Sequence, residues 1–314
     1  MMAVFAIVVI KSPSSPTGET EPTSRSSDRF PTSNDSGSTG PATALKLSLK
    51  PGADVRYRVN MTTGGTLSAG GQKQPISGAI NATMSWHVVS VNRKGLASVE
   101  VKMRDFTGTM GGQAIPARAG SSFRIRVAPD GRVLSSSDLG LGSVGGTGLQ
   151  LPGSGQISPL LPDHPVRPGD TWKKDFTQAF PFGAGRLHLT STNTYLRNET
   201  MGGDKAAVIQ STESFPIDFT LDMRELLKLS GRSARSLGLP GGSNLKLVYK
   251  GKATIRSIDW LDIRAGQVVR SEASAWFDMD LLIKGVPADN LPGGNRVSYT
   301  GSMTLEIDRI PPEL

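Results

Sequence analysis

Apolar and polar residues alternate with a period of two along most of this chain, from residue 44 onward. Val55, Tyr57 and Val59 fall on one side of a run whose other side carries Arg56 and Arg58. Such alternation is typical of a β-strand with one buried and one solvated face, and therefore of an antiparallel sheet covered on one side. The pattern predicts a curved meander of about ten to twelve strands.

Short motifs recur in the same order in the two halves of the chain. A Pro-Gly pair opens each half, at Pro51 and Pro168, and an Asp-Phe-Thr triplet follows, at Asp105 and Asp218. The recurrence predicts a β domain built from two repeated units and a last strand. These three parts lie at about residues 44–137, 166–285 and 295–309.

One stretch follows helical spacing instead. Met223, Leu226 and Leu227 share one side of a predicted helix, and Asp222 with Glu225 forms a capping box at its start. An amphipathic helix inserted between strands of a one-sided sheet would cover the apolar face. The sequence therefore predicts a mainly β fold. It is a curved antiparallel sheet, or half-barrel, of two repeated β units, with one amphipathic helix covering the concave face.

The beginning of the chain has a different composition from the rest. Residues 1–11 contain a short apolar run, which we interpret as the remnant of a signal or anchor segment. Residues 12–43 are rich in Ser, Thr, Pro and Gly, which predicts a disordered tether in front of a β domain at 44–314. This order predicts an exported protein, located in the periplasm, in the cell envelope or outside the cell. A cytosolic protein with an incidental apolar start is the alternative.

Charge and cysteine content narrow the range of partners. The chain has 35 Lys and Arg against 27 Asp and Glu, a formal net charge of +8, and no cysteine. The absence of cysteine excludes disulfides and thiolate chemistry. The basic residues are scattered through the strands without a nucleic-acid-binding motif, so we predict no nucleic-acid partner. A basic outer sheet face would instead suit an anionic envelope polymer.

Residues that carry chemistry are few. His87 and His188 lie in corresponding strands, but no carboxylate pattern accompanies them, so no metal site is predicted. His164 stands between prolines, and the chain has no Gly-x-Ser-x-Gly elbow to present a nucleophile. Asp278 and Asp280 share the solvated side of their strand. We therefore expect no catalytic residue and no cofactor, and predict that the protein is not an enzyme.

The segment Pro168-Gly169-Asp170-Thr171-Trp172 resembles the strand opener of an uncharacterised family of bacterial exported β-rich proteins. Members also carry a later Gly-x-Val hairpin, matched here by Gly266-Gln267-Val268, and the resemblance covers about residues 44–310. It implies no catalytic residues. In architecture the predicted fold is similar to the lipoprotein-carrier fold of bacterial envelopes, which holds acyl chains in its concave face. This chain lacks the lipid-bearing cysteine of a lipoprotein.

Three functions remain open on these observations. The first is a non-catalytic structural or interaction role in the cell envelope, and the second is binding or carriage of an apolar ligand such as a lipid between sheet and helix. The third is an enzyme, for which no constellation of residues is found. Adaptable apolar side chains would line a lipid site. The predicted lining residues are Met84, Met103, Met223, Leu226, Leu227, Met279 and Met303.

Overall fold

The computed structural model describes residues 41–115, 121–135, 159–179, 183–222, 245–285 and 294–311. In these residues the fold is mainly β, as predicted: all twelve strands belong to one antiparallel sheet, and no helix occurs among them. The strands are β1 (Asp54–Ala69), β2 (Gln72–Val91), β3 (Ala97–Met110), β4 (Gln113–Ala114), β5 (Ser121–Val127), β6 (Val133–Ser135), β7 (Thr171–Ala179), β8 (Gly183–Met201), β9 (Asp204–Asp222), β10 (Lys246–Asp262), β11 (Gln267–Lys284) and β12 (Arg296–Ile310).

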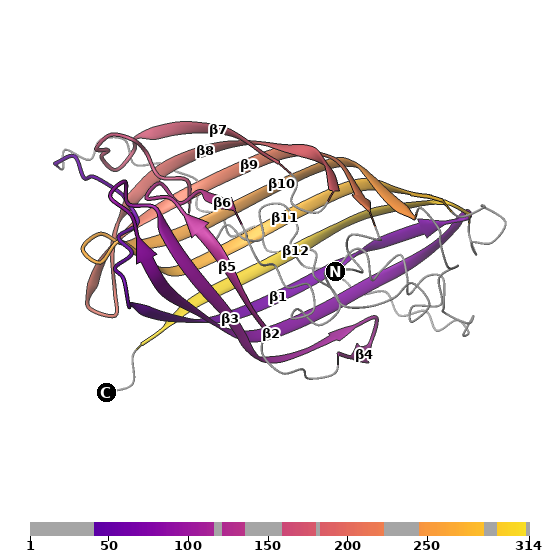
Figure 1. Ribbon diagram of the computed structural model, residues 1–314, viewed down its shortest axis with the longest axis horizontal. Helices are drawn as coiled ribbons and strands as arrows, with labels where there is room; N and C mark the ends of the chain where they lie inside the picture. Colours follow the sequence, from indigo (N-terminus) through magenta and orange to yellow (C-terminus); the bar gives the residue numbers. More distant parts are fainter. Residues whose placement is uncertain are drawn as a thin grey trace.

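The first and last strands meet in the middle of the sheet (Figure 1). The order is β6-β5-β3-β2-β1-β12-β11-β10-β9-β8-β7, with β4 attached to β3. β1 and β12 are paired along their length, so that Thr63 stands opposite Met303. The sheet is therefore two meanders joined at the chain's own two end strands, which the prediction of a simple meander did not anticipate. β6 and β7 are the two edges, and the sheet is not closed between them.

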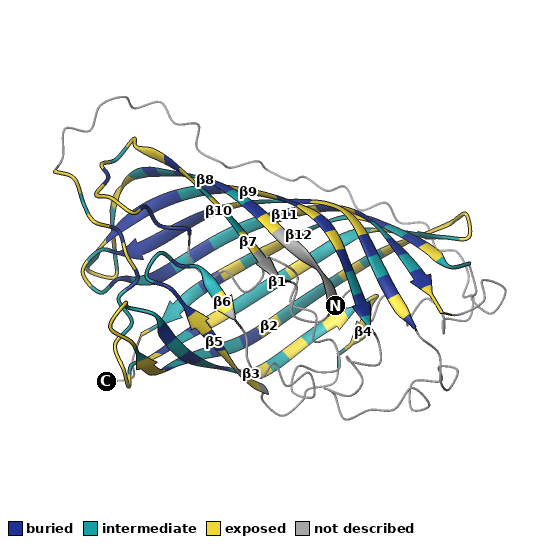
Figure 2. Cartoon of the chain, turned by 45° about the horizontal axis from the view of Figure 1, so that its top comes forward, coloured by how far each residue is buried: buried dark blue, intermediate teal, exposed yellow. Residues whose placement is uncertain are grey.

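Alternation along the strands places apolar side chains on one side, which we call the inner face; Figure 2 shows the alternation of buried and less buried residues. Buried residues of this face form two clusters. The capped-end cluster includes Val99 of β3, Ile125 of β5, Trp172 of β7 and Tyr195 of β8. Because β5 and β7 are far apart in the strand order, their presence in one cluster indicates a strongly curved sheet. The far cluster is built mainly from β8 to β12 and includes Phe215.

The prediction of a sheet covered on one side only is wrong at one end. Residues 206–209 of β9 and 258–262 of β10 are buried without alternation, and a third cluster of Ala206, Val208, Ile258, Trp260 and Val269 lies on the outer face there. The Arg270 guanidinium covers the Trp260 ring at 5.5 Å from its centroid. Side chains of neighbouring strands thus cover the outer face, as long basic side chains commonly do.

Two extended segments, residues 43–50 and 159–166, cross one end of the sheet, which we call the capped end. The Leu47 amide donates to the Pro129 carbonyl in the β5–β6 turn, and the Ser48 amide donates to the Gly266 carbonyl in the β10–β11 turn. The two segments also pair with each other through Thr43, the last residue of the predicted tether, and Val166. Leu45 and Leu47 are buried in the capped-end cluster.

The second crossing segment connects the two sheet edges that the strands leave unpaired. The Leu161 amide donates to the Asp130 carbonyl in the turn beside β6, at 2.9 Å. The carbonyl of the preceding residue, Leu160, accepts a hydrogen bond from the indole N–H of Trp172 in β7, at 2.7 Å. At the capped end, the chain itself therefore spans the gap between the edges.

The two Pro-Gly openings adopt the same local structure. The Gly52 amide donates to the Val88 carbonyl in β2, and the Gly169 amide donates to the Tyr195 carbonyl in β8. Both glycines have positive φ, 77° and 95°, which glycine adopts at little cost. The acceptor strand has a bulge beside Val88 and beside Tyr195. Duplication of the whole β unit stays a prediction.

The Asp-Phe-Thr triplets do not share a conformation. Asp105 lies at a bulge of β3 and has a φ of 51°. Asp218 is paired in regular register with Lys250 of β10. The sequence match at these two positions therefore does not reflect a common backbone structure.

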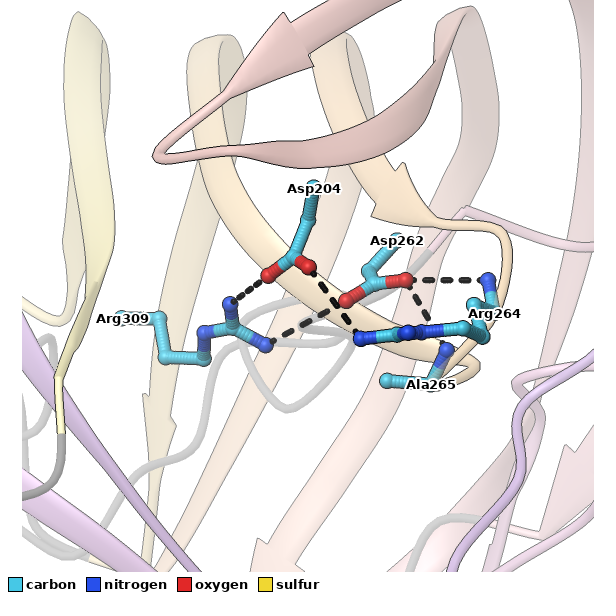
Figure 3. A network of polar contacts seen from close by, with 5 residues as sticks. All are labelled: Asp204, Asp262, Arg264, Ala265 and Arg309. Carbon is cyan, nitrogen blue, oxygen red and sulfur yellow. Dashed lines mark hydrogen bonds and ion pairs between the residues drawn. The ribbon is translucent and has the colours of Figure 1, made fainter.

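An ionic network joins three parts of the chain at the capped end (Figure 3). One carboxylate oxygen of Asp262 accepts the backbone N–H groups of Arg264 and Ala265, each at 2.9 Å. Arg309 of β12 lies 3.3 Å from Asp204 and 3.8 Å from Asp262. Since Asp262 is only 2% exposed, this network fixes the β10–β11 turn against the end of β12.

Replacing Asp262 with Ala is expected to lower the free energy of unfolding by about 2 kcal/mol, because two partly buried backbone donors lose their acceptor and Arg309 loses an ion-pair partner. Asp262→Asn keeps an acceptor for the turn and is expected to lose about 1 kcal/mol. Urea unfolding measures both. Asp280→Ala, at a half-exposed position 3.8 Å from Arg296, is the control and should change stability by less than about 0.5 kcal/mol. An Asp262→Ala loss no larger than the control would contradict the role of the network.

Several predicted parts lie outside the described residues. They are the signal or anchor segment, the tether up to residue 40, and the helix residues Met223, Leu226 and Leu227. Asp222, predicted as the helix cap, is the last residue of β9 and is paired with Lys246 of β10. The amphipathic helix stays a prediction.

Candidate functional site

The four predicted methionines that the structure describes all belong to the inner face, but they divide between its two clusters. Met84 and Met103 stand opposite each other in β2 and β3, within or against the capped-end cluster. Met279 of β11 and Met303 of β12 lie in the far cluster. The structure therefore brings the predicted lining residues together in pairs, not as one group.

A row of buried polar side chains separates the two clusters on β8 to β11. Along β9, Ile209 belongs to the capped-end cluster and Phe215 to the far cluster, and the two inner residues between them are polar. We call this group the polar belt. Its buried members are Ser191, Asn193, Ser211, Glu213, Asp259 and Ser271. A buried polar group destabilises the fold unless it is hydrogen-bonded, so the hydrogen-bond partners of each belt residue are described in turn.

Asn193 is the centre of one half of the belt. Its side-chain oxygen accepts hydrogen bonds from the hydroxyls of Ser191, at 3.1 Å, and Ser211, at 2.8 Å. Its amide nitrogen is buried and has no hydrogen-bond partner in the described part of the chain. Trp86 Nε1 and Tyr249 Oη, one in each apolar cluster, are buried and unpaired in the same way. The inner face thus presents polar atoms without partners.

Asp259 is the centre of the other half. Its two carboxylate oxygens accept hydrogen bonds from Ser271, at 2.6 Å, and from the partly buried Ser257, at 2.7 Å. Burial raises the pKa of Asp259 to about 6, although both serine hydroxyls oppose the shift by stabilising the carboxylate. No lysine, arginine or histidine forms an ion pair with Asp259 within the described residues.

Glu213 is also buried, but unlike Asp259 it accepts no hydrogen bond from a described residue. Burial, and secondarily the negative charge of Asp259, raise the pKa of its carboxyl to about 7. In the residues that the structure describes, its carboxyl has neither a hydrogen bond nor a salt bridge, although only 6% of the residue is exposed. Buried carboxyls with raised pKa values are frequent at functional sites, because such sites use groups whose charge a ligand or substrate can change.

The belt was not predicted, although the sequence carries a signal for it. Ser211 and Glu213 occupy the apolar phase of β9, two and four residues after Ile209, and Asp259 occupies the apolar phase of β10, two residues before Leu261. A polar residue in the buried phase of a strand indicates either a paired core group or a site. The sequence predictions rested on histidines and on paired acids of solvated faces, and not on single acids in apolar runs.

The other candidate groups remain on the outside. His87 bonds to Asp54 at 2.9 Å, and His188 to Thr177 at 3.1 Å, both on exposed surface. His164 is exposed. Across the described ranges, no group of three or more His, Cys, Asp or Glu is placed to hold a metal ion. Those same ranges contain no helix long and apolar enough to cross a membrane.

No family model and no curated protein matches the chain. Three solved structures show weak likeness. DynF from the dynemicin biosynthesis pathway of Micromonospora chersina is 10% identical over 88% of this chain and 92% of its own, with a TM-score of 0.21. A DUF1329 family protein from Desulfovibrio piger is 9% identical over 82% and 83%, with a TM-score of 0.15. A domain named for outer membrane lipoprotein sorting, from Vibrio parahaemolyticus, is 8% identical over 82% and 83%, with a TM-score of 0.13.

TM-scores this low carry no functional argument. The resemblance to an exported bacterial family accordingly stays a prediction.

Proposed function

We propose that this protein is a non-catalytic binding module, and that its inner sheet face holds a largely apolar ligand such as a lipid. The observation that supports it best is the composition of that face. Two clusters of apolar side chains are separated by a belt that contains a buried amide nitrogen without a hydrogen-bond partner and the carboxyl of Glu213, which has no partner among the described residues. A face of mostly apolar groups with a few convergent polar atoms is the usual composition of a small-molecule site.

Location in the cell envelope is part of the same proposal. The apolar run at the start of the chain and the Ser/Thr/Pro/Gly-rich residues after it support export. A lipid or another membrane-derived molecule would be a natural ligand in that compartment. No nucleic acid, metal or cofactor enters the proposal.

Native mass spectrometry of the full chain, purified from cells that express it, tests the binding function. We expect a bound small molecule whose mass disappears after organic extraction, and uptake of a fluorescent alkyl probe by the extracted protein. Met303→Ala, on the inner face of β12, is expected to change probe affinity at least about threefold, because it alters the volume of the far cluster. Trp276→Gln, at a 50% exposed position of β11, is the matched control.

A ligand-free mass together with no probe uptake would contradict the binding function. Unchanged probe affinity in Met303→Ala would place the ligand elsewhere than the far cluster. Thermal unfolding of each variant, followed by circular dichroism, separates lost binding from lost folding.

A structural or interaction role is the second candidate, and one observation favours it. Exposed arginines gather on the outer face of β1, β3 and β5, namely Arg58, Arg104, Arg124 and Arg126. Such a surface suits an anionic envelope polymer, and binding of that kind weakens as salt screens the charges. Retention on an anionic polysaccharide column at low salt, lost in the quadruple Ala variant, would support this role.

A further inference from the structure

The inner face contains a buried carboxyl that no cation or hydrogen-bond donor of the described chain partners. Glu213 has no salt bridge or hydrogen bond among the described residues, and the Asp259 carboxylate near it is held only by two serine hydroxyls. Without a partner, a buried carboxyl avoids the cost of a buried charge by staying protonated. A cation placed beside it would stabilise the carboxylate instead. A positive group is therefore a partner that Glu213 could take from a ligand.

An independent observation points to a ligand at the same place. Asn193 is fully buried, and both neighbouring hydroxyls, Ser191 and Ser211, are already directed to its oxygen. Its amide nitrogen keeps two N–H donors with no acceptor within the described residues. Buried donors are rarely left unsatisfied, since each such group costs about 1–3 kcal/mol. The missing partner of Asn193 is an acceptor such as an oxygen.

The register of β8 and β9 places Asn193 and Glu213 close to each other. Ser191 stands opposite Glu213, and Asn193 stands opposite Ser211, on the paired strands β8 and β9. Asn193 and Glu213 are therefore diagonal neighbours on one face, at a backbone separation of roughly 7–8 Å. Side chains of this length can both reach a group placed between them. Ile209 and Phe215 lie on either side along β9 and offer apolar contact to the rest of a ligand.

We propose that the polar belt binds the protonated amine of an otherwise apolar ligand. The Glu213 carboxylate accepts from the ammonium, and Asn193 donates to an oxygen beside the amine. Asp259, which stands opposite Ile209 on β10, lies farther along the belt. The ligand class is a long-chain amine with a hydroxyl or carbonyl on a neighbouring carbon. This assignment rests on the proposed function, since it names the head group of the ligand held by the inner face.

Three probes of equal chain length test the assignment: dodecylamine, dodecanol and dodecanoic acid. Each is titrated into the full chain by isothermal calorimetry at pH 7.5, below its critical micelle concentration. We expect the amine to bind at least tenfold more tightly than the alcohol, and the fatty acid to bind more weakly than the alcohol. In Glu213→Gln the preference for amine over alcohol should fall below threefold while alcohol affinity is retained. Asn193→Asp, which adds a negative charge at the belt, should not weaken the amine.

The matched control is Asp218→Asn, which removes an exposed carboxylate from the outer face of the same strand and should leave the preference unchanged. Equal binding of amine and alcohol by the wild type, or an amine preference that survives in Glu213→Gln, would overturn the assignment and leave the binding function intact. Failure of all three probes to bind would overturn both. Retained alcohol affinity in Glu213→Gln also shows that this variant is folded.

Discussion

Glu213→Gln is expected to remove most of a fall in stability that the wild-type protein undergoes between about pH 5 and pH 8. Burial raises the pKa of this carboxyl from 4.5 to about 7 in the folded state. The folded protein therefore binds a proton that the unfolded chain has already released, and stability decreases as pH rises through this interval. The contribution is fully present below about pH 4.5 and is lost as the pH rises through about 7.

The size of the effect follows from the shift. One pKa unit corresponds to about 1.4 kcal/mol, so Glu213 alone accounts for roughly 2 kcal/mol between pH 5 and pH 8. Urea unfolding at both pH values measures it: relative to the wild type, Glu213→Gln should gain about 2 kcal/mol more at pH 8 than at pH 5. Asp218→Asn, on the exposed side of β9, should show no such difference. If Glu213→Gln and the wild type differed in free energy of unfolding by the same amount at pH 5 and at pH 8, Glu213 would not be a buried carboxyl without a partner.

Trp172→Ala is expected to be the most destabilising single substitution that we consider, with a loss of about 4 kcal/mol in the free energy of unfolding. The Trp172 ring is 6% exposed in the capped-end cluster. Its N–H holds the Leu160 carbonyl and thereby connects β7 to the segment that crosses the capped end. Truncation leaves a cavity and an unsatisfied carbonyl together.

Two further variants separate these contributions. Trp172→Phe keeps most of the apolar volume but removes the hydrogen bond, and should lose about 1–2 kcal/mol. Trp276→Ala removes an indole that is 50% exposed on the outer face of β11 and should lose less than about 0.5 kcal/mol. Urea unfolding measures all three. Similar losses for Trp172→Ala and Trp276→Ala would mean that the capped end contributes little to stability.

The alternation of apolar and polar residues with a period of two was sufficient to predict the class of fold. Val55 and Tyr57 are buried and Arg58 is exposed, as their alternation predicted. Local turn chemistry was also informative, because Gly52 and Gly169 open β1 and β7 with the positive φ that a Pro-Gly turn favours. These features depend on neighbouring residues, which a sequence shows directly.

The arrangement of strands and the candidate site depend on distant residues, and they were not predicted. Nothing near β1 indicates that its partner is β12, because register between strands far apart is set by the packing of the whole sheet. Glu213 and Asp259 each look like a single acid in a strand. They become a site only when β8 to β10 place Asn193 and the serines beside them.

The pairing of β1 with β12 determines when this protein can finish folding. Each meander consists of hairpins between neighbouring strands, which form quickly because little chain entropy is lost in closing them. The central pair joins residues far apart in the sequence, such as Arg56 and Ile310, and forms only after both meanders are available. Until then β1 has an exposed edge that attracts other strands. The stage before β12 pairs with β1 is therefore the one at which this chain is most prone to aggregate.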